Sequence, residues 1–364
     1  MFAFPVFRRF LKHSFESDCA GWRKIDCVSK SGCDHFNRCV LGRSGGVEGW
    51  SRAAGTGILV PTMNDGDLTI LSPAAAAVTL AALWIGEAVL PAFVEHEGFR
   101  RSVRWRNLCL AGLNIVVAAS FAGLTLLVTT WSEQLGAGIL HQLGLLMPGS
   151  TAIAIILVCL AFLLLDLWGY LFHVLAHQLP LLWRFHALHH NARHFEVTLA
   201  LRFHAVEIAV QGLLSLPVYF LIGVGIQEIL IYQLVLVPMA FFHHCNVRMP
   251  QGIDRMLSWV LVTPGMHVIH HSKWVRETDS NYAPVFSIWD RAFGSYRWRD
   301  RPETVEVGLA GFNDEQVDTL RGMLKTGFDG SPAGPGNPPA DELIPVRLRD
   351  GDGRSAEVTS TKPT

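Results

Sequence analysis

Charged residues are scarce in this chain. Asp, Glu, Lys and Arg make up 17% of the 364 residues and hydrophobic residues 50%, whereas ordinary globular domains are about 25% charged. The formal net charge of -1 gives no electrostatic reason to expect a nucleic acid or another polyanion as partner. The apolar residues are gathered in long runs, so the composition favours a membrane protein over a soluble one.

Short cysteine pairs are absent as well. None of the seven cysteines forms the CxxC pair that is typical of zinc and iron–sulfur sites, and no CxxCH motif for haem attachment occurs. Cys19, Cys27, Cys33 and Cys39 lie close to His35 in the sequence. These five residues could form a metal or disulfide cluster, but we interpret them as incidental.

Five apolar stretches reach or approach the roughly 20 residues that a membrane-spanning helix needs. They are Leu68–Val94, Leu108–Trp131, Ala152–Phe172, Ile208–Val224 and Ile229–Phe242. The fifth is short and follows the fourth closely, so the two form either a tight hairpin of spans or a partly re-entrant pair. Glu87 and Asp166 lie inside apolar runs, where a carboxylate is costly unless it is paired, and each is therefore a candidate functional residue.

The distribution of arginines predicts the orientation in the membrane. Arg100, Arg101, Arg104 and Arg106 follow the first stretch, and further arginines follow the third and fifth, whereas the loop Ser132–Ser150 has no Lys or Arg. The positive-inside rule places the arginine-rich side in the cytoplasm. We therefore predict an all-α, multi-pass integral membrane protein with about four to five transmembrane helices and a cytoplasmic helical cap.

The two ends of the chain differ from its middle. Residues 1–62 are basic and show little periodicity, and Met63 begins a short acidic leader. We expect residues 1–62 to be a poorly structured extension, with translation beginning at Met63, and residues 63–328 to form the membrane domain. Val305–Phe328 predicts a short soluble helix on the cap, and the residues 329–364, rich in Gly, Pro and Asp, predict a disordered tail.

Histidines are concentrated in one part of the chain, since twelve of the sixteen lie between His173 and His271. His173 and His177 form an HxxxH pair that shares one helix face with Asp166 and Tyr170. The i,i+4 spacing lets both rings reach one metal ion.

Two HxxHH motifs follow, at His186–His190 and at His267–His271. Consecutive histidines diverge by about 100° on a helix, so they can serve metal ions on either side. Imidazole suits iron, copper and zinc, and eight to ten imidazoles exceed the roughly four to six ligands of one ion. The pattern therefore predicts two metal ions, each with an open position. Beside apolar helices, such a redox pair indicates oxidation of a substrate that resides in the bilayer.

Together these motifs resemble the fatty acid hydroxylase and sterol desaturase superfamily over roughly Leu68 to Phe328. The matching runs are Asp-x-x-x-Tyr-x-x-His-x-x-x-His from Asp166, Leu-Trp-Arg-x-His-x-x-His-His from Leu182, Leu-Arg-Phe-His from Leu201 with the following Glu207, His-x-Asn-Val-Arg-x-Pro from His244, His-x-x-His-His from His267, Asn281-Tyr282, and Trp-Asp-Arg-x-Phe-Gly from Trp289. Ala205 replaces the usual Pro and Cys245 a small polar residue, and neither departure removes a ligand.

The resemblance implies a lipid hydroxylase or desaturase with two non-haem iron ions at the cytoplasmic face. It implies dioxygen as co-substrate, and a separate electron donor such as a ferredoxin, cytochrome or reductase. Carried onto this sequence, the implied iron ligands are His173, His177, His186, His189, His190, His204, His244, His267, His270 and His271. His244 matches rather than His243 because it precedes Asn246 by two residues, and His194 has no counterpart.

Polar residues near these motifs are candidates for supporting roles. We expect Asp166, Tyr170 and Asn246 to be catalytic residues, and these three with Asn281 and Asp290 to orient imidazole N–H groups.

Two alternatives stay open: an alkyl-ether monooxygenase of the same superfamily, and a non-redox membrane protein that binds or transports metal. Transport needs ionisable groups through the depth of the bilayer, whereas only Glu87 and Asp166 lie in the predicted spans.

Overall fold

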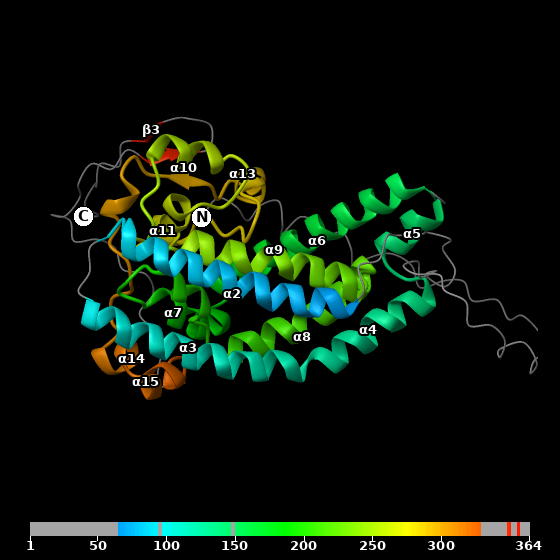
Figure 1. Cartoon of the computed structure of the whole chain (residues 1–364), viewed down its shortest axis with the longest axis horizontal. Helices are drawn as coiled ribbons and strands as arrows, with labels where there is room; N and C mark the ends of the chain where they lie inside the picture. The colour runs from blue at the N-terminus through cyan, green and yellow to red at the C-terminus, as the bar shows by residue number, and fades with distance from the viewer. Residues whose placement is uncertain (1–64, 94–96, 147–149, 329–347, 351–354, 357–364) are drawn as a thin grey trace, which may run out of the picture. The chain divides into compact units, whose positions relative to one another are not determined.

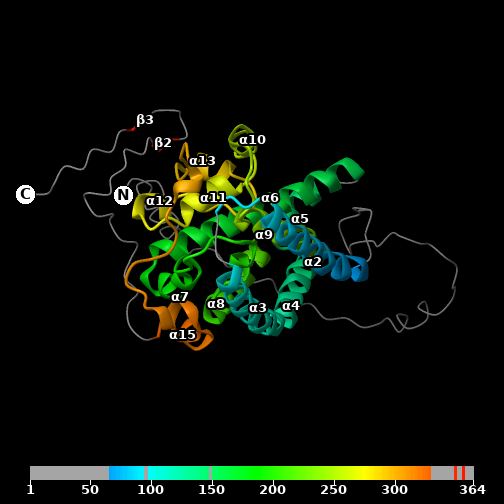
Figure 2. The same ribbon diagram turned by 60° about the vertical axis from the view of Figure 1, so that its left-hand side comes forward.

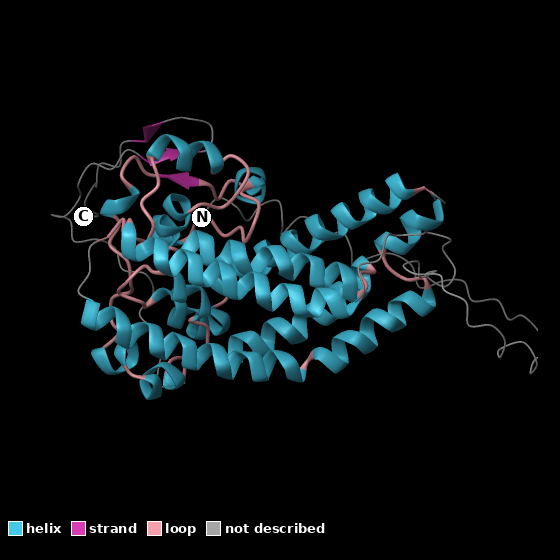
Figure 3. Cartoon of the chain, in the orientation of Figure 1, coloured by secondary structure: helices cyan, strands magenta, loops and turns pink. Residues whose placement is uncertain are grey.

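A computed structural model describes residues 65–93, 97–146, 150–328, 348–350 and 355–356 of the chain. The predictions for residues 1–62, for the N-terminal cysteines and for Met63 lie outside these residues. The described part is mostly helical (Figure 3), as the all-α prediction requires.

The helices form one long-helix region and one region of short elements. The α-helices are α2 (Asp65–Val89), α3 (Glu97–Ser120), α4 (Ala122–Leu135), α5 (Ile139–Leu146), α6 (Thr151–Gln178), α7 (Pro180–His190), α8 (Ala205–Ile222), α9 (Ile226–His244), α10 (Gln251–Leu257), α11 (Pro264–His270), α12 (Val275–Thr278), α13 (Ile288–Phe293), α14 (Asp314–Asp318) and α15 (Leu320–Lys325). The 3-10 helices are η1 (Val197–Leu201) and η2 (Pro302–Thr304).

Five segments are long and apolar enough to cross a membrane, which confirms the prediction of a multi-pass protein. They are Asp67–Val89, Arg101–Leu146, Thr151–Gln178, Ala205–Ile222 and Ile226–His244. The last two are full helices, each long enough to span, joined by a tight turn in which Gly223 adopts a positive φ of 79°. The hairpin alternative therefore describes them better than the re-entrant one.

The second span differs from its prediction because it is interrupted. Helix α3 ends at Ser120, and α4 begins at Ala122 after a break at Phe121. The ring of Phe121 packs against Gly212 of α8. A Cβ atom on Gly212 would lie only 3.1 Å from Cγ of that ring. The missing side chain of Gly212 thus leaves room for the aromatic ring at the bend. Hydropathy alone does not locate this break.

The long helices pack with their apolar sides partly outward. Helix α9 packs against α2 and α6, and α8 packs against α3 and α4, as Figures 1 and 2 both show. Side chains such as Ile70, Val78 and Ile115 are exposed by 68% or more. Exposed apolar side chains on this scale are expected where lipid rather than water covers a helix.

The short elements form a cap at the end of the bundle where α6 and α9 finish (Figure 1). The single helix expected over Val305–Phe328 is wrong in detail, because two short helices, α14 and α15, stand there. Thr319 is extended and caps α15, and a Cβ on Gly322 would clash with the carbonyl of Glu315. Close packing of the two helices therefore requires glycine at position 322.

Three short strands form a small antiparallel sheet in the order β1-β2-β3. They are β1 (Arg297–Trp298), β2 (Leu348–Asp350) and β3 (Ser355–Ala356). The last two fall inside the predicted tail 329–364, for which no order was expected. The other residues of that tail lie outside the described chain.

Candidate metal centre

Nine histidines come together in two adjacent groups where the long helices meet the cap. Group A consists of His173, His177, His186, His190 and His270, and group B consists of His189, His244, His267 and His271. Within each group, one nitrogen of every ring lies within 4.8 Å of those of all the others. The histidines come from α6, α7, α9 and α11 and the residue that follows α11.

Helical spacing explains how four elements build two groups. Pairs at i,i+4 fall in the same group, as in His186 with His190 and His267 with His271, while neighbouring histidines in the chain fall in different groups. The divergence predicted for consecutive histidines is therefore present in both HxxHH motifs. Both motifs lie on short helices with Pro at the first turn, a position where its missing N–H costs nothing.

Most rings of group A are held at Nδ1 by an oxygen acceptor. His173 Nδ1 lies 2.7 Å from the Tyr282 carbonyl and His270 Nδ1 lies 2.7 Å from the Ser280 carbonyl. A carbonyl only accepts, so Nδ1 carries the proton in both rings and, in a neutral ring, Nε2 carries a lone pair. These two Nε2 atoms lie 3.0 Å apart. Neither can donate to the other, so the contact is repulsive unless a cation lies between them.

Carboxylates hold two further rings of group A. Glu207 Oε1 lies 2.7 Å from His186 Nδ1, and Asp279 Oδ1 lies 3.3 Å from His177 Nδ1. A carboxylate on Nδ1 fixes the ring orientation and raises the basicity of Nε2 toward a metal.

Group B is held differently. His244 Nδ1 lies 2.8 Å from the Ala240 carbonyl of its own helix, but the Nδ1 atoms of His189 and His267 are buried without a hydrogen-bond partner. Ring packing takes their place: His189 stacks on Phe203 with centroids 4.4 Å apart and planes 10° apart. Around His244 Nε2, the Nε2 atoms of the other three rings lie 3.0–3.3 Å away.

The donor set fits two metal ions. Burial lowers the pKa of His189, His190, His267, His270 and His271 well below the ordinary value, so these imidazoles are neutral at physiological pH. Neutral imidazole is the form that binds a metal. Five and four converging nitrogens match the coordination needs of two transition-metal ions and suit iron, copper or zinc.

His204 is the one predicted ligand that the structure leaves outside both groups. It precedes α8 as its N-cap, with Nδ1 accepting from the Val206 N–H at 3.1 Å and Nε2 lying 3.2 Å from the Leu324 carbonyl. His243 also belongs to neither group, although its ring lies 4.2 Å from that of His267. The choice of His244 over His243 agrees with this geometry.

The residues expected to support the centre lie around it without touching the ligands. Within the described chain, no hydrogen bond joins Asp166, Tyr170 or Asn246 to a histidine ring. The Asp166 carboxylate accepts from Tyr232, from the Phe286 N–H and from Trp289 Nε1 at 2.8–3.2 Å. Tyr170 Oη lies 2.9 Å from Ser295 Oγ. Their expected catalytic roles stay predictions.

Asn281 and Asp290 shape the loop beside group A. Asn281 binds the backbone of Met266 and Arg297, and Asp290 accepts from the N–H groups of Tyr282 and Ala283 at 2.7 and 3.0 Å. Asp290 thus acts on His173 indirectly, through the Tyr282 carbonyl.

No supporting role was predicted for the groups that do contact imidazole Nδ1, although Glu207 was named as part of a matching run. Glu207 had a signal, because it follows the Arg-Phe-His run as the only acidic residue at the start of an apolar helix. Asp279 and the carbonyls of Ser280 and Tyr282 had none, since they belong to a loop whose path depends on tertiary packing.

A family model described as fatty acid hydroxylase matches residues 158–295, a range that contains all nine grouped histidines. Among curated proteins, the chain is 34% identical over 142 residues to the ornithine lipid hydroxylase OlsE of Rhizobium tropici, covering 39% of this chain and 42% of that protein. It is 34% identical over 142 residues to the alkylglycerol monooxygenase of Xenopus tropicalis, covering 38% and 30%.

A third relative is a cholesterol 25-hydroxylase-like protein of Danio rerio, 30% identical over 138 residues that cover 36% of this chain and 52% of that one. The chain thus matches between about a third and a half of the length of these relatives. No solved structure matches the chain significantly.

Proposed function

Because this chain belongs to the fatty acid hydroxylase and sterol desaturase superfamily, we propose that it is a membrane-bound oxidoreductase that uses dioxygen to hydroxylate or desaturate a lipid. The observation that carries the proposal is the pair of histidine groups at the end of a bundle of apolar helices. Nine converging imidazoles beside a lipid-facing surface suit a redox metal pair acting on a membrane substrate.

We assign two iron ions to the site, one to each group. Bound there, the iron pair would activate dioxygen for attack on an unactivated C–H bond, which acid–base chemistry does not achieve. The protein's own part is to hold the rings: carbonyls and carboxylates orient group A, and Phe203 and Phe195 pack on the rings of group B. Burial keeps His189, His190, His267, His270 and His271 neutral.

Hydroxylation is the outcome we favour. The three relatives are named as hydroxylases or monooxygenases, and the substrates in their names, an ornithine lipid, an alkylglycerol and cholesterol, are all lipids. The arginine-rich ends of the spans favour a metal centre on the cytoplasmic side. Electrons would come from a separate ferredoxin, cytochrome or reductase.

Metal transport fits the geometry less well. The histidines gather at one end of the bundle, and the buried carboxylates of the described spans, Glu87, Asp166 and Glu207, each take part in hydrogen bonds. A conduction path would need ionisable groups along the membrane depth.

The test uses full-length protein purified in detergent after growth with added iron. Elemental analysis and Mössbauer spectroscopy should find about two coupled iron ions per chain. With a surrogate ferredoxin and reductase, oxygen uptake should depend on added lipid, and mass spectrometry should find a product heavier by one oxygen atom. Ornithine lipid, alkylglycerol, sterol and phospholipid form the substrate panel. Iron-loaded protein that oxidises none of them, or protein that holds only zinc after iron-rich growth, would contradict the proposal.

A further inference from the structure

We propose that Glu87 of α2 is a positioning residue for group B, and that the two N-terminal helices α2 and α3 hold one half of the metal centre in place. The inference rests on the proposed function in one respect, namely that group B holds a metal ion. Glu87 and its partner Arg104 lie outside residues 158–295, the part that matches the family model. Their role therefore belongs to the part of the chain that the family match does not cover.

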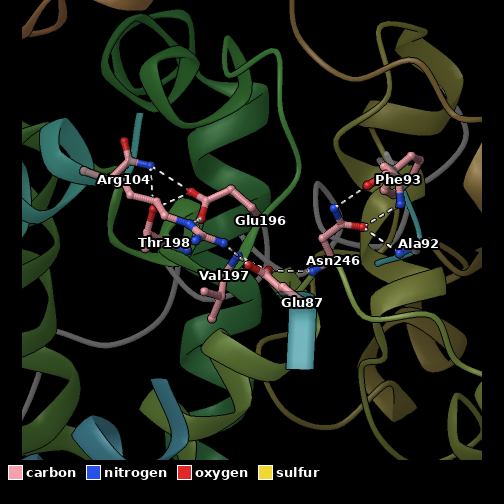
Figure 4. A network of polar contacts seen from close by, with 9 residues as sticks. Glu87, Ala92, Phe93, Arg104, Glu196, Val197, Thr198 and Asn246 are labelled. Carbon is pink, nitrogen blue, oxygen red and sulfur yellow. Dashed lines mark hydrogen bonds and ion pairs between the residues drawn. The ribbon is translucent and has the colours of Figure 1, made fainter. Parts of the chain in front are cut away.

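Glu87 is completely buried near the cap end of an apolar span, and all its contacts are strong (Figure 4). Oε1 accepts from the backbone N–H of Val197 at 2.6 Å and of Asn246 at 2.8 Å. Oε2 pairs with the Arg104 guanidinium at 2.6 Å. A buried carboxylate is tolerated when hydrogen bonds and an opposite charge surround it. Here those partners come from α3, η1 and the segment after α9.

The contact with Asn246 reaches His244 through two peptide units. Asn246 stands two residues after His244, the ligand at the centre of group B. Its side chain accepts from the N–H groups of Ala92 and Phe93 at 3.0 and 2.7 Å and donates to the Phe93 carbonyl at 3.0 Å. Backbone bonds from Ala92 to Asn246 and from Arg248 to Leu90 complete the connection. These bonds join the segment after α9 to the segment after α2, and Glu87 binds the same segment through the Asn246 N–H.

A second path runs through aromatic rings. Phe93 meets Phe195 edge to face, with centroids 6.3 Å apart. Phe195 in turn lies 6.1 Å from His244 and 5.6 Å from His271. Glu196, the next residue, binds Arg104 at 3.2 Å. The Glu87–Arg104–Glu196 cluster therefore fixes the ring that covers group B as well as the backbone behind it.

Group A has no comparable dependence on α2. Its Nδ1 partners are Glu207, Asp279 and the carbonyls of Ser280 and Tyr282, all within residues 158–295. Group B has two rings whose Nδ1 atoms lack partners, so it relies on backbone position and ring packing. Removal of Glu87 should therefore disturb group B selectively.

The experiment compares Glu87→Ala and Glu87→Gln with the wild type, all as full-length protein purified in detergent. The wild type should hold about two iron ions per chain, Glu87→Ala about one, and Glu87→Gln a value between them. Glutamine rescues in part because its oxygen can still accept from both N–H groups. In Glu87→Ala the remaining ferric ion should give the EPR signal of a mononuclear site, where the wild type has a coupled, EPR-silent pair.

A control separates positioning from nonspecific effects of a substitution. Glu133→Ala removes an exposed carboxylate at the end of α4 and should match the wild type. If Glu87→Ala does not fold, Asn246→Ala breaks the same junction while the Glu87–Arg104 ion pair stays in place, and it should also lose about half the iron.

The outcomes are distinct. The inference would be overturned if Glu87→Ala kept two iron ions and an unchanged spectrum, or if it lost iron equally from both groups. Two intact ions in Asn246→Ala would also overturn it. The proposed function would still stand in each case. A wild type that does not hold two ions would instead overturn the proposed function.

Discussion

The two histidine groups share α7 and α11, but group A adds rings from α6 and group B a ring from α9, and the two are supported in different ways. Group A has five donors, and four of its rings have an oxygen on Nδ1. Group B has four donors, and two of its rings have no partner on Nδ1. An oxygen acceptor on Nδ1 fixes the orientation of the ring and also raises the basicity of Nε2 toward a metal ion. Packing alone fixes only the orientation. The comparison leads us to expect that the two groups bind metal with unequal affinity.

Removal of a histidine from either group should have the largest effect on iron content and on lipid oxidation. We expect His270→Ala to lose the ion of group A and His267→Ala that of group B, with lipid oxidation reduced at least ~100-fold in each. His204→Ala should keep both ions and lose only about 1 kcal/mol of stability, the usual contribution of a helix N-cap. Elemental analysis and thermal unfolding check this. Loss of iron from His204→Ala would instead support the ten-ligand set that the family resemblance implies.

Removal of a carboxylate that holds a ring of group A should have the second-largest effect on iron binding. Glu207→Ala leaves His186 Nδ1 without its acceptor, so we expect the iron affinity of group A to fall ~10–100-fold while group B is unchanged. Glu207→Gln should lose much less, since the amide oxygen can still accept from Nδ1–H. Iron titration followed by Mössbauer spectroscopy distinguishes the two sites. Equal affinities in the alanine and glutamine variants would show that Glu207 does not orient the ring.

Chelation should separate the two sites in the wild type. With excess chelator we expect two phases of iron release, with the ion of group B leaving ~10-fold faster. The His267→Ala variant serves as the control, because only the slow phase should remain. Release of both ions in a single phase would mean that the different support of the two groups does not alter their strength.

The smallest effect should come from the longest contact in group A. Asp279 lies 3.3 Å from His177 and its side chain is 33% exposed, so water can replace part of its role. We expect Asp279→Asn to change iron affinity and turnover by less than ~3-fold. A loss as large as that of Glu207→Ala would show that this contact shortens when the metal is bound.

The membrane helices and the histidine pairs could be predicted because each depends on local spacing. Apolar length identifies a span, and i,i+4 spacing places two rings on one side of a helix. The break at Phe121 could not be predicted, since it depends on the absence of a side chain at Gly212 on another helix. The same holds for the short helices α14 and α15, whose boundary at Thr319 is set by close packing at Gly322.

The grouping of the histidines could be predicted more fully than the contacts that hold their rings. Spacing on a helix brings His186 and His190 together, but nothing in a run of residues shows that His204 turns away to cap α8. Asn246 was expected to face an imidazole, whereas it fastens α9 to the residues after α2. The orientations of His204 and Asn246 depend on hydrogen bonds between distant segments, which cannot be predicted from the spacing of residues along the chain.

Each HxxHH helix supplies histidines to both groups. This limits which insertions the two helices can accept during evolution. A one-residue insertion between Ala187 and His189 would turn the later donors by about 100° about the helix axis. His189 and His190 would then both leave their positions, so each ion would lose a ligand from a single change in chain length. The same holds for α11. We expect lineages of this chain to tolerate insertions in the loops of the cap but none inside these two helices, because each helix supplies donors to both groups.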